Sequence, residues 1–229
     1  MTVAVYLEAG AKRTFAAAVE WPGWCRGGRR EDDALAGLLA YGARYRAALS
    51  AAGAGADLAL PADVADLEVV ERIAGDATTD FGAPGAAPSA DDRPLDAREL
   101  DRQCSLLGAA WVAFDTAVVA GTGIELRSGP RGGGRSLDAI VEHVRDAEAA
   151  YLSRLGARIA PLGRGDRAAE FALLRDTVRD TLRARADGGP IERPSRARSL
   201  WSPRYFVRRA AWHVLDHAWE IEDRSAPAR

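Results

Sequence analysis

Near its C-terminal end the chain reads Trp212-His213-Val214-Leu215-Asp216-His217, and this run indicates both a helix and a site. A spacing of four residues places the two imidazoles on one side of a helix, one turn apart. Ser202-Pro203, a typical cap followed by proline at the first helical position, precedes it. We therefore predict a helix near 203–223. Its apolar seam consists of Val207, Ala211, Val214, Ala218 and Ile221.

Three further segments upstream also have the apolar spacing of helices. They lie near 95–121, 136–158 and 166–187, and Ser136 is the expected N-cap of the second. In the first, apolar side chains recur at steps of four and three residues, which is typical of the seam of a helical bundle. Four helices of similar length predict an all-α four-helix bundle over residues 95–224. The long connections fit a crossover topology at least as well as simple up-and-down turns.

The N-terminal part has a different pattern. Residues 2–8 and 13–20 read as two strands, 31–50 as a helix with acids in its first turn, and 67–73 as a third strand. This predicts an α+β domain over residues 1–75, with a short antiparallel sheet plus a helix. Residues 76–94 are rich in Gly, Ala, Pro, Asp and Ser, a composition that predicts a linker.

Composition limits the classes of function. The 229 residues carry a net charge of −2, so no global positive field argues for nucleic acid as a partner. We find no signal-peptide pattern and no apolar run near 18 residues, and Cys25 and Cys104 form no C-x-x-C motif. We expect a soluble cytoplasmic protein with reduced thiols and no membrane or nucleic-acid contact. A single lysine beside abundant arginine and alanine indicates GC-rich coding.

Only three histidines occur in the chain, and the third, His143, lies in the second predicted helix. One remote histidine plus a His-x-x-x-His pair is a common way to hold a divalent metal with a coordination position left open. Neutral imidazole suits zinc, nickel, copper or ferrous iron. A ligating histidine usually donates its other N–H to a carboxylate or carbonyl, and the nearby candidates are Glu220, Asp216 and Glu142.

Residues 95–223 resemble the DinB/YfiT-like metal-binding four-helix proteins. Glu142-His143-Val144-Arg145-Asp146-Ala147-Glu148 is similar to the motif of their second helix, and Arg208–His217 to that of their fourth. The resemblance covers just over half of the chain. It implies a divalent metal, most often zinc or nickel, held by His143, His213 and His217 with water completing the shell. Some members of this family are S-transferases or isomerases that use a low-molecular-weight thiol as cosubstrate.

The N-terminal unit resembles the HicB-like antitoxin fold. Trp21-Pro22-Gly23-Trp24-Cys25, then Gly28, then Asp33-Ala34-Leu35 is similar to the family's Pro-Gly turn, glycine and acidic helix start. HicB antitoxins often append a DNA-binding domain, whereas a predicted helical bundle follows here. The resemblance therefore implies the fold and not the antitoxin role.

Two hypotheses of function follow. The first is a metal-dependent enzyme acting on a small molecule, a thiol S-transferase or isomerase, with Glu220 or Asp216 orienting an imidazole or assisting proton transfer. The alternative is a binding or regulatory protein whose metal is structural or absent and whose N-terminal unit engages a protein partner. Trp212, Leu215 and Trp219 give the last helix a second apolar face. We expect this second face to be buried against another surface, either the N-terminal unit or the second subunit of a homodimer.

Overall fold

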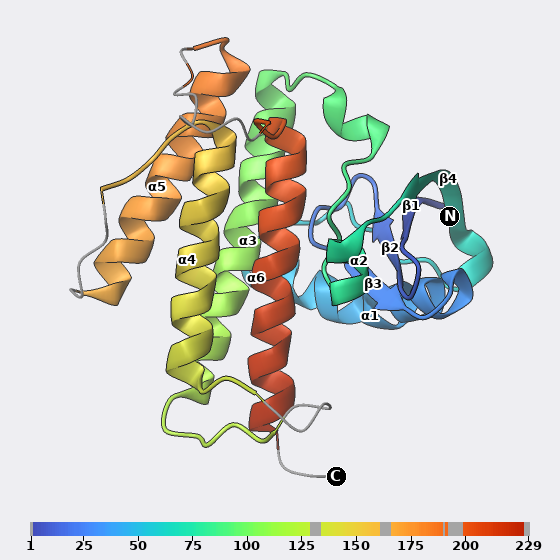
Figure 1. Cartoon of the computed structure of the whole chain (residues 1–229), viewed down its shortest axis with the longest axis horizontal. Coiled ribbons are helices and arrows are strands. Elements are labelled where there is room, and N and C mark those ends of the chain that lie inside the picture. The colour runs from blue at the N-terminus through green and yellow to red at the C-terminus, as the bar shows by residue number, and fades with distance from the viewer. Residues whose placement is uncertain (1, 129–133, 161–165, 190, 192–198, 227–229) are drawn as a thin grey trace.

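A computed structural model describes residues 2–128, 134–160, 166–189, 191 and 199–226. The chain forms an α+β unit followed by a helical unit, with the last helix, α6, lying between the sheet and the other long helices (Figure 1). One cluster of buried apolar side chains runs through both parts, from Val5 and Leu38 to Leu107 and Val214. The sheet and the helices are therefore packed against each other through a shared core.

The sheet has four strands in the order β3-β2-β1-β4. Strands β1 (Val3–Ala9), β2 (Thr14–Ala18) and β3 (Cys25–Gly28) pair antiparallel, and β4 (Leu67–Ala74) pairs parallel with β1. The prediction of a purely antiparallel sheet is wrong, because the chain crosses over through helix α1 before β4 joins the far edge. Strand β3 is not predicted from the sequence, because it is short and contains two glycines.

Helix α1 (Glu31–Ala51) covers the sheet, and its first turn carries the expected acids. The indole of Trp24 stacks on Tyr45 with ring centroids 5.7 Å apart and donates to the carbonyl of Leu38 at 2.9 Å. The Tyr45 hydroxyl donates to the carbonyl of Pro22 at 2.9 Å. These bonds satisfy polar groups that burial would otherwise penalise, and they fix the Trp-Pro-Gly-Trp turn against the helix.

The segment between the predicted units contains short helices of its own, α2 (Ala77–Phe81) and the 3-10 turn η2 (Ser89–Asp92); another 3-10 turn, η1 (Val64–Asp66), precedes β4. Glu8 of β1 is fully buried, and its carboxylate accepts from the Thr79 hydroxyl at 2.5 Å and from the amides of Gly85 and Ala86 at 2.8 and 3.0 Å. Residues 76–94 are therefore tied to the sheet through one carboxylate.

The long helices are α3 (Ala97–Gly121), α4 (Leu137–Leu155), α5 (Arg167–Ala186) and α6 (Pro203–Ser225). Their bounds match the predicted helices within a few residues. Ser136 and Ser202 cap α4 and α6 as expected, accepting from the amides of Ala139 and Tyr205. α3 and α4 both contact α6, and α5 packs on α3 and α4. α3 is long and apolar enough to cross a membrane by length and composition alone, but its apolar face packs against α6 as a core helix does.

Helix α6 is buried on nearly all sides, and the N-terminal unit covers its second apolar face. Trp212 meets Phe15 edge-on at 6.2 Å, and Trp219 meets Tyr41 at 5.2 Å between ring centroids. Arg208 is only 6 % exposed and donates to both carboxylate oxygens of Asp91 at 2.7 Å. It also donates to the carbonyls of Ala18, the last residue of β2, and of Val19, the residue that follows. α6 is therefore fixed to the sheet by both apolar and polar contacts.

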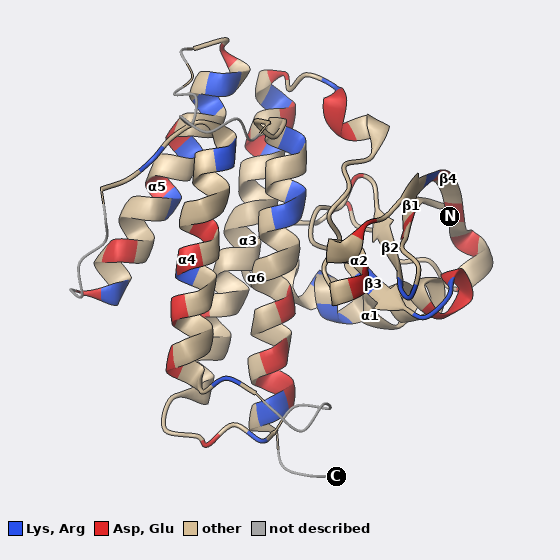
Figure 2. Cartoon of the chain, viewed as in Figure 1, with Lys and Arg blue, Asp and Glu red and all other residues tan. Residues whose placement is uncertain are grey.

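The charges along α6 are arranged against the helix dipole. Figure 2 shows basic residues near its start and acidic residues toward its end, whereas the dipole favours the opposite order; Arg224 in the last turn is the exception. Tertiary partners account for the arrangement. Arg204 pairs with Glu99 at 2.9 Å, and Glu222 pairs with Arg44 at 2.5 Å. The sequence of α6 is thus fitted to its neighbours rather than to an isolated helix.

Candidate metal centre

The three histidines come together at one place, on the line where α4 meets α6. His143 comes from α4, and His213 and His217 come from consecutive turns of α6. One nitrogen from each ring belongs to a set of atoms that all lie within 4.8 Å of one another. Helix geometry produces the α6 pair, and the contact between α4 and α6 adds the third ring. The predicted grouping of these side chains is present.

The spacing of one pair of ring nitrogens fits a tetrahedral ion. Nε2 of His143 and Nε2 of His213 are 3.2 Å apart. Two ligands at the usual zinc–nitrogen bond length, placed at tetrahedral angles, are separated by about 3.3 Å. His213 is 6 % exposed and its Nδ1 is buried without a hydrogen-bond partner in the described part of the chain. A buried imidazole of this kind is costly unless one of its nitrogens has a strong partner.

The protonation states also suit a metal. Burial lowers the pKa of His213 well below its ordinary value, and the charges of His217, Arg209 and His143 lower it further. Burial likewise lowers the pKa of His143, helped by His217 and by the Arg135 charge. Both rings are therefore neutral near pH 7. A neutral imidazole offers the lone pair that a divalent ion requires.

Glu220 holds His217 in place. Its Oε2 lies 2.8 Å from Nδ1 of His217, and its Oε1 accepts from Arg224 at 2.7 Å. The hydrogen bond to His217 is the main reason that the pKa of Glu220 is lowered. With Nδ1 engaged, Nε2 of His217 is the nitrogen left for a ligand. This is the carboxylate–histidine arrangement found behind many metal sites, and it agrees with the predicted role of Glu220 as an orienting residue.

The other two predicted carboxylates contact arginines. Asp216 lies on the side of α6 that faces the sheet, where it accepts from Arg26 of β3 at 3.1 Å. Glu142 is exposed and lies 3.9 Å from Arg167 of α5. Their contacts within the described residues are thus arginines rather than imidazoles. Sequence proximity selected three candidates, and the structure places one of them, Glu220, against a histidine.

Two residues beside the histidines were not predicted as part of the site. The Tyr151 ring meets His213 edge-on with centroids 5.6 Å apart. Arg209, one turn before His213 on α6, lies over the rings of Tyr151 and Trp212 at 5.5 and 4.6 Å. Their helical offsets would have identified them: Arg209 is four residues before His213, and Tyr151 is eight residues after His143.

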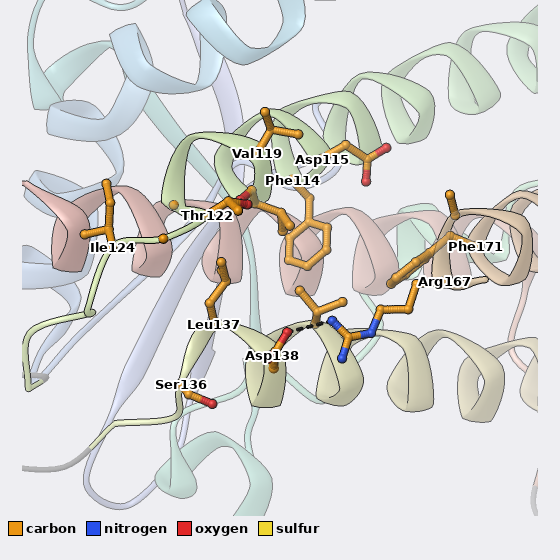
Figure 3. Close-up of a pocket in the computed structure, with 15 residues that line it drawn as sticks. Phe114, Asp115, Val119, Thr122, Ile124, Ser136, Leu137, Asp138, Arg167 and Phe171 are labelled. Atoms are coloured by element: carbon orange, nitrogen blue, oxygen red, sulfur yellow. Dashed lines mark hydrogen bonds and ion pairs between the residues drawn. The ribbon is translucent and has the colours of Figure 1, made fainter. Parts of the chain in front are cut away.

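A pocket at the other side of α4 lies away from this centre. It has a volume of about 600 Å³ and is lined by apolar side chains of α3, α4 and α5, with Arg167 bonded to Asp138 at 2.6 Å at its polar side (Figure 3). Val141 of its wall is two residues from His143, which places the two side chains on opposite sides of α4. The histidines therefore do not line this pocket.

Buried Cys25 and half-buried Cys104 are free thiols. Burial raises the pKa of both, so neither is a thiolate near neutral pH. No family model, curated protein or solved structure compared with this chain matches it. The arrangement of side chains is accordingly the basis for assigning a function.

Proposed function

We propose that the chain is a divalent-metal-binding protein of the DinB type, a four-helix bundle with a HicB-like unit at its N-terminus. We further propose that it works in the cytoplasm as a metal-dependent enzyme, a thiol S-transferase or isomerase. The observation that carries the metal is the convergence of His143, His213 and His217, with Glu220 holding His217 from behind. Among the ions that imidazole donors suit, we propose zinc or nickel, as the DinB resemblance implies.

The chain's own residues prepare the site. Neutral His143 and His213 present lone pairs, and Glu220 fixes the tautomer and the direction of His217. Three protein nitrogens are one ligand fewer than a closed structural zinc site contains, which leaves a position for a substrate atom. When bound, the ion would supply a Lewis acid that lowers the pKa of a coordinated thiol or water.

Positive charge beside the histidines favours an anionic substrate. Arg135 and Arg209 are close enough for their charges to lower the pKa of His213. The Nη1 atom of Arg209 is buried and has no acceptor among the described residues. An unpaired guanidinium donor is well suited to a carboxylate. We propose that Arg209 and Arg135 attract the carboxylate of the thiol or of its electrophilic partner.

Cobalt substitution tests this function directly. We expect the Co²⁺-loaded protein to develop a sulfur-to-cobalt charge-transfer band when 2-mercaptoethanol is added, because the thiolate takes the open position. Ethylene glycol is the matched control without sulfur, and His143→Ala is the matched protein with one ligand removed. A cobalt spectrum that the thiol leaves unchanged would contradict a thiol-binding centre.

The alternative is a binding protein whose N-terminal unit engages a partner. One observation favours it: β4 is an edge strand that pairs only with β1 in the described sheet, and its Val70 is 53 % exposed. An open strand edge can accept a strand from another protein. A metal-free protein with an unchanged melting temperature, together with a stoichiometric partner lost in Val70→Lys, would favour this alternative.

A further inference from the structure

A second pocket lies where the N-terminal unit meets α6. Its volume is about 470 Å³, within the range of sites that hold small molecules. Residues of β2, β3 and α1 form one side and residues of α6 form the other. The pocket therefore exists only because the two parts of the chain are docked.

Aromatic side chains form the walls of this pocket. Phe15 and Tyr41 come from the N-terminal unit, and Trp212 and Trp219 come from α6. The two tryptophans are seven residues apart and so lie on one side of the helix. In the described ranges neither indole N–H donates to a protein acceptor, and neither nitrogen is among the buried polar atoms that lack a partner, so both donors remain open to solvent or to a ligand. Aromatic faces with unpaired donors beside them suit a planar ring that carries acceptor atoms.

The charges of the pocket leave one cation without a carboxylate. Each of the three acidic residues in the lining is already paired with an arginine: Asp216 with Arg26 at 3.1 Å, Glu220 with Arg224 at 2.7 Å, and Asp223 with Arg44 at 2.9 Å. Arg13, immediately before β2, is partly buried, and among the described residues its guanidinium has no acceptor. An arginine with five free donors favours a carboxylate.

The pocket also borders the metal centre. Glu220 lines the pocket and at the same time holds Nδ1 of His217. A ligand that changes the position or the hydrogen bonds of Glu220 also changes the hydrogen bond that orients the His217 ring. Such a link couples the two sites in both directions, because coupling free energies between binding sites are reciprocal.

We propose that this pocket binds an aromatic monocarboxylate, with its ring against the aromatic side chains that line the pocket and its carboxylate on Arg13. The ligand then acts on the histidines through Glu220. Binding in the pocket stands on the lining residues alone, whereas the effect on the histidines rests on the proposed function. The N-terminal unit thereby supplies one wall and the anion-binding group of a small-molecule site.

Calorimetric titration of the full chain with 2-naphthoate tests the pocket. We expect saturable binding that weakens at least tenfold in Arg13→Gln and stays unchanged in Lys12→Gln, the neighbouring exposed cation. The neutral analogue 2-naphthylmethanol is expected to bind at least tenfold more weakly than the acid. Equal binding of the two compounds, equal binding by Arg13→Gln and wild type, or no binding by wild type would each overturn the proposal.

A second titration tests the link and separates the two proposals. We expect 2-naphthoate to change the affinity for Zn²⁺ severalfold in wild type and to leave it unchanged in Glu220→Gln. Naphthoate binding without any zinc binding would contradict the proposed metal-dependent function and support the proposed ligand pocket. Zinc binding without naphthoate binding would support the metal site and contradict the ligand pocket. Zinc affinity that the ligand does not change in wild type would overturn the link through Glu220.

Discussion

Replacing Arg208 by alanine tests how strongly the two parts of the chain are joined. Its guanidinium makes four hydrogen bonds of 2.7 to 2.9 Å, two to Asp91 and two to the carbonyls of Ala18 and Val19. Asp91 is only 1 % exposed. The variant leaves a buried carboxylate without its cation, and breaking such a pair costs about 3–5 kcal/mol. For a chain of this size the melting temperature should fall by on the order of 10 °C.

Urea unfolding followed by circular dichroism and by tryptophan fluorescence measures the effect. Both probes should report one coincident transition in wild type, because one core runs through both parts. Arg183→Ala is the control: its pair with Asp180 is exposed, so its loss should change the free energy of unfolding by less than about 0.5 kcal/mol. An Arg208→Ala loss no larger than that of the control would refute the reasoning.

Three further predictions concern single positions. Burial raises the pKa of Glu148 from 4.5 to about 7 in the folded state, so the folded protein holds this proton more tightly than the unfolded chain. Stability from this group is therefore full below pH 4.5 and is lost as the pH rises through 7, by on the order of 3 kcal/mol. Glu148→Gln should keep the hydrogen bond from Trp111 and flatten this pH dependence in urea titrations at pH 5 to 8. Glu220→Gln should weaken zinc binding by roughly 10- to 100-fold in a chelator competition, since it removes the charged partner of His217; an unchanged affinity would disprove the orienting role. Gly23→Ala should lower the melting temperature, because residue 23 has φ of +94° and an added Cβ would lie 2.8 Å from a side-chain atom of α6; a melting temperature equal to wild type would show that the turn can relax.

Local rules predicted most of the helical unit and the histidines. The spacing between His213 and His217 lies within one helical turn, so sequence alone places the two rings together. Serine caps at 136 and 202 set the starts of α4 and α6 within a residue. His143 was harder, because its approach to α6 depends on how two helices pack. The prediction that it joins the α6 pair rested on the pattern of one remote histidine plus a His-x-x-x-His pair and on the resemblance to the DinB/YfiT-like motifs.

Non-local pairing accounts for what the sequence did not reveal. Nothing in residues 67–74 says that β4 joins β1 in parallel, 64 residues away in the chain. The partner of Asp216 is Arg26, 190 residues away, and only the docked sheet brings them together. The composition of residues 76–94 is typical of a linker and gives no sign that their amides donate to the buried carboxylate of Glu8. Contacts of this kind depend on the whole fold rather than on spacing.

The metal content of protein purified without a nickel column tests the central claim most directly. Mass spectrometry of wild type should find one divalent ion per chain, as three converging imidazoles imply. His217→Ala and His213→Ala should lose it, and Lys12→Gln should keep it. Wild-type protein that takes up no zinc or nickel even after their addition, or histidine variants that retain the full metal content, would contradict the account.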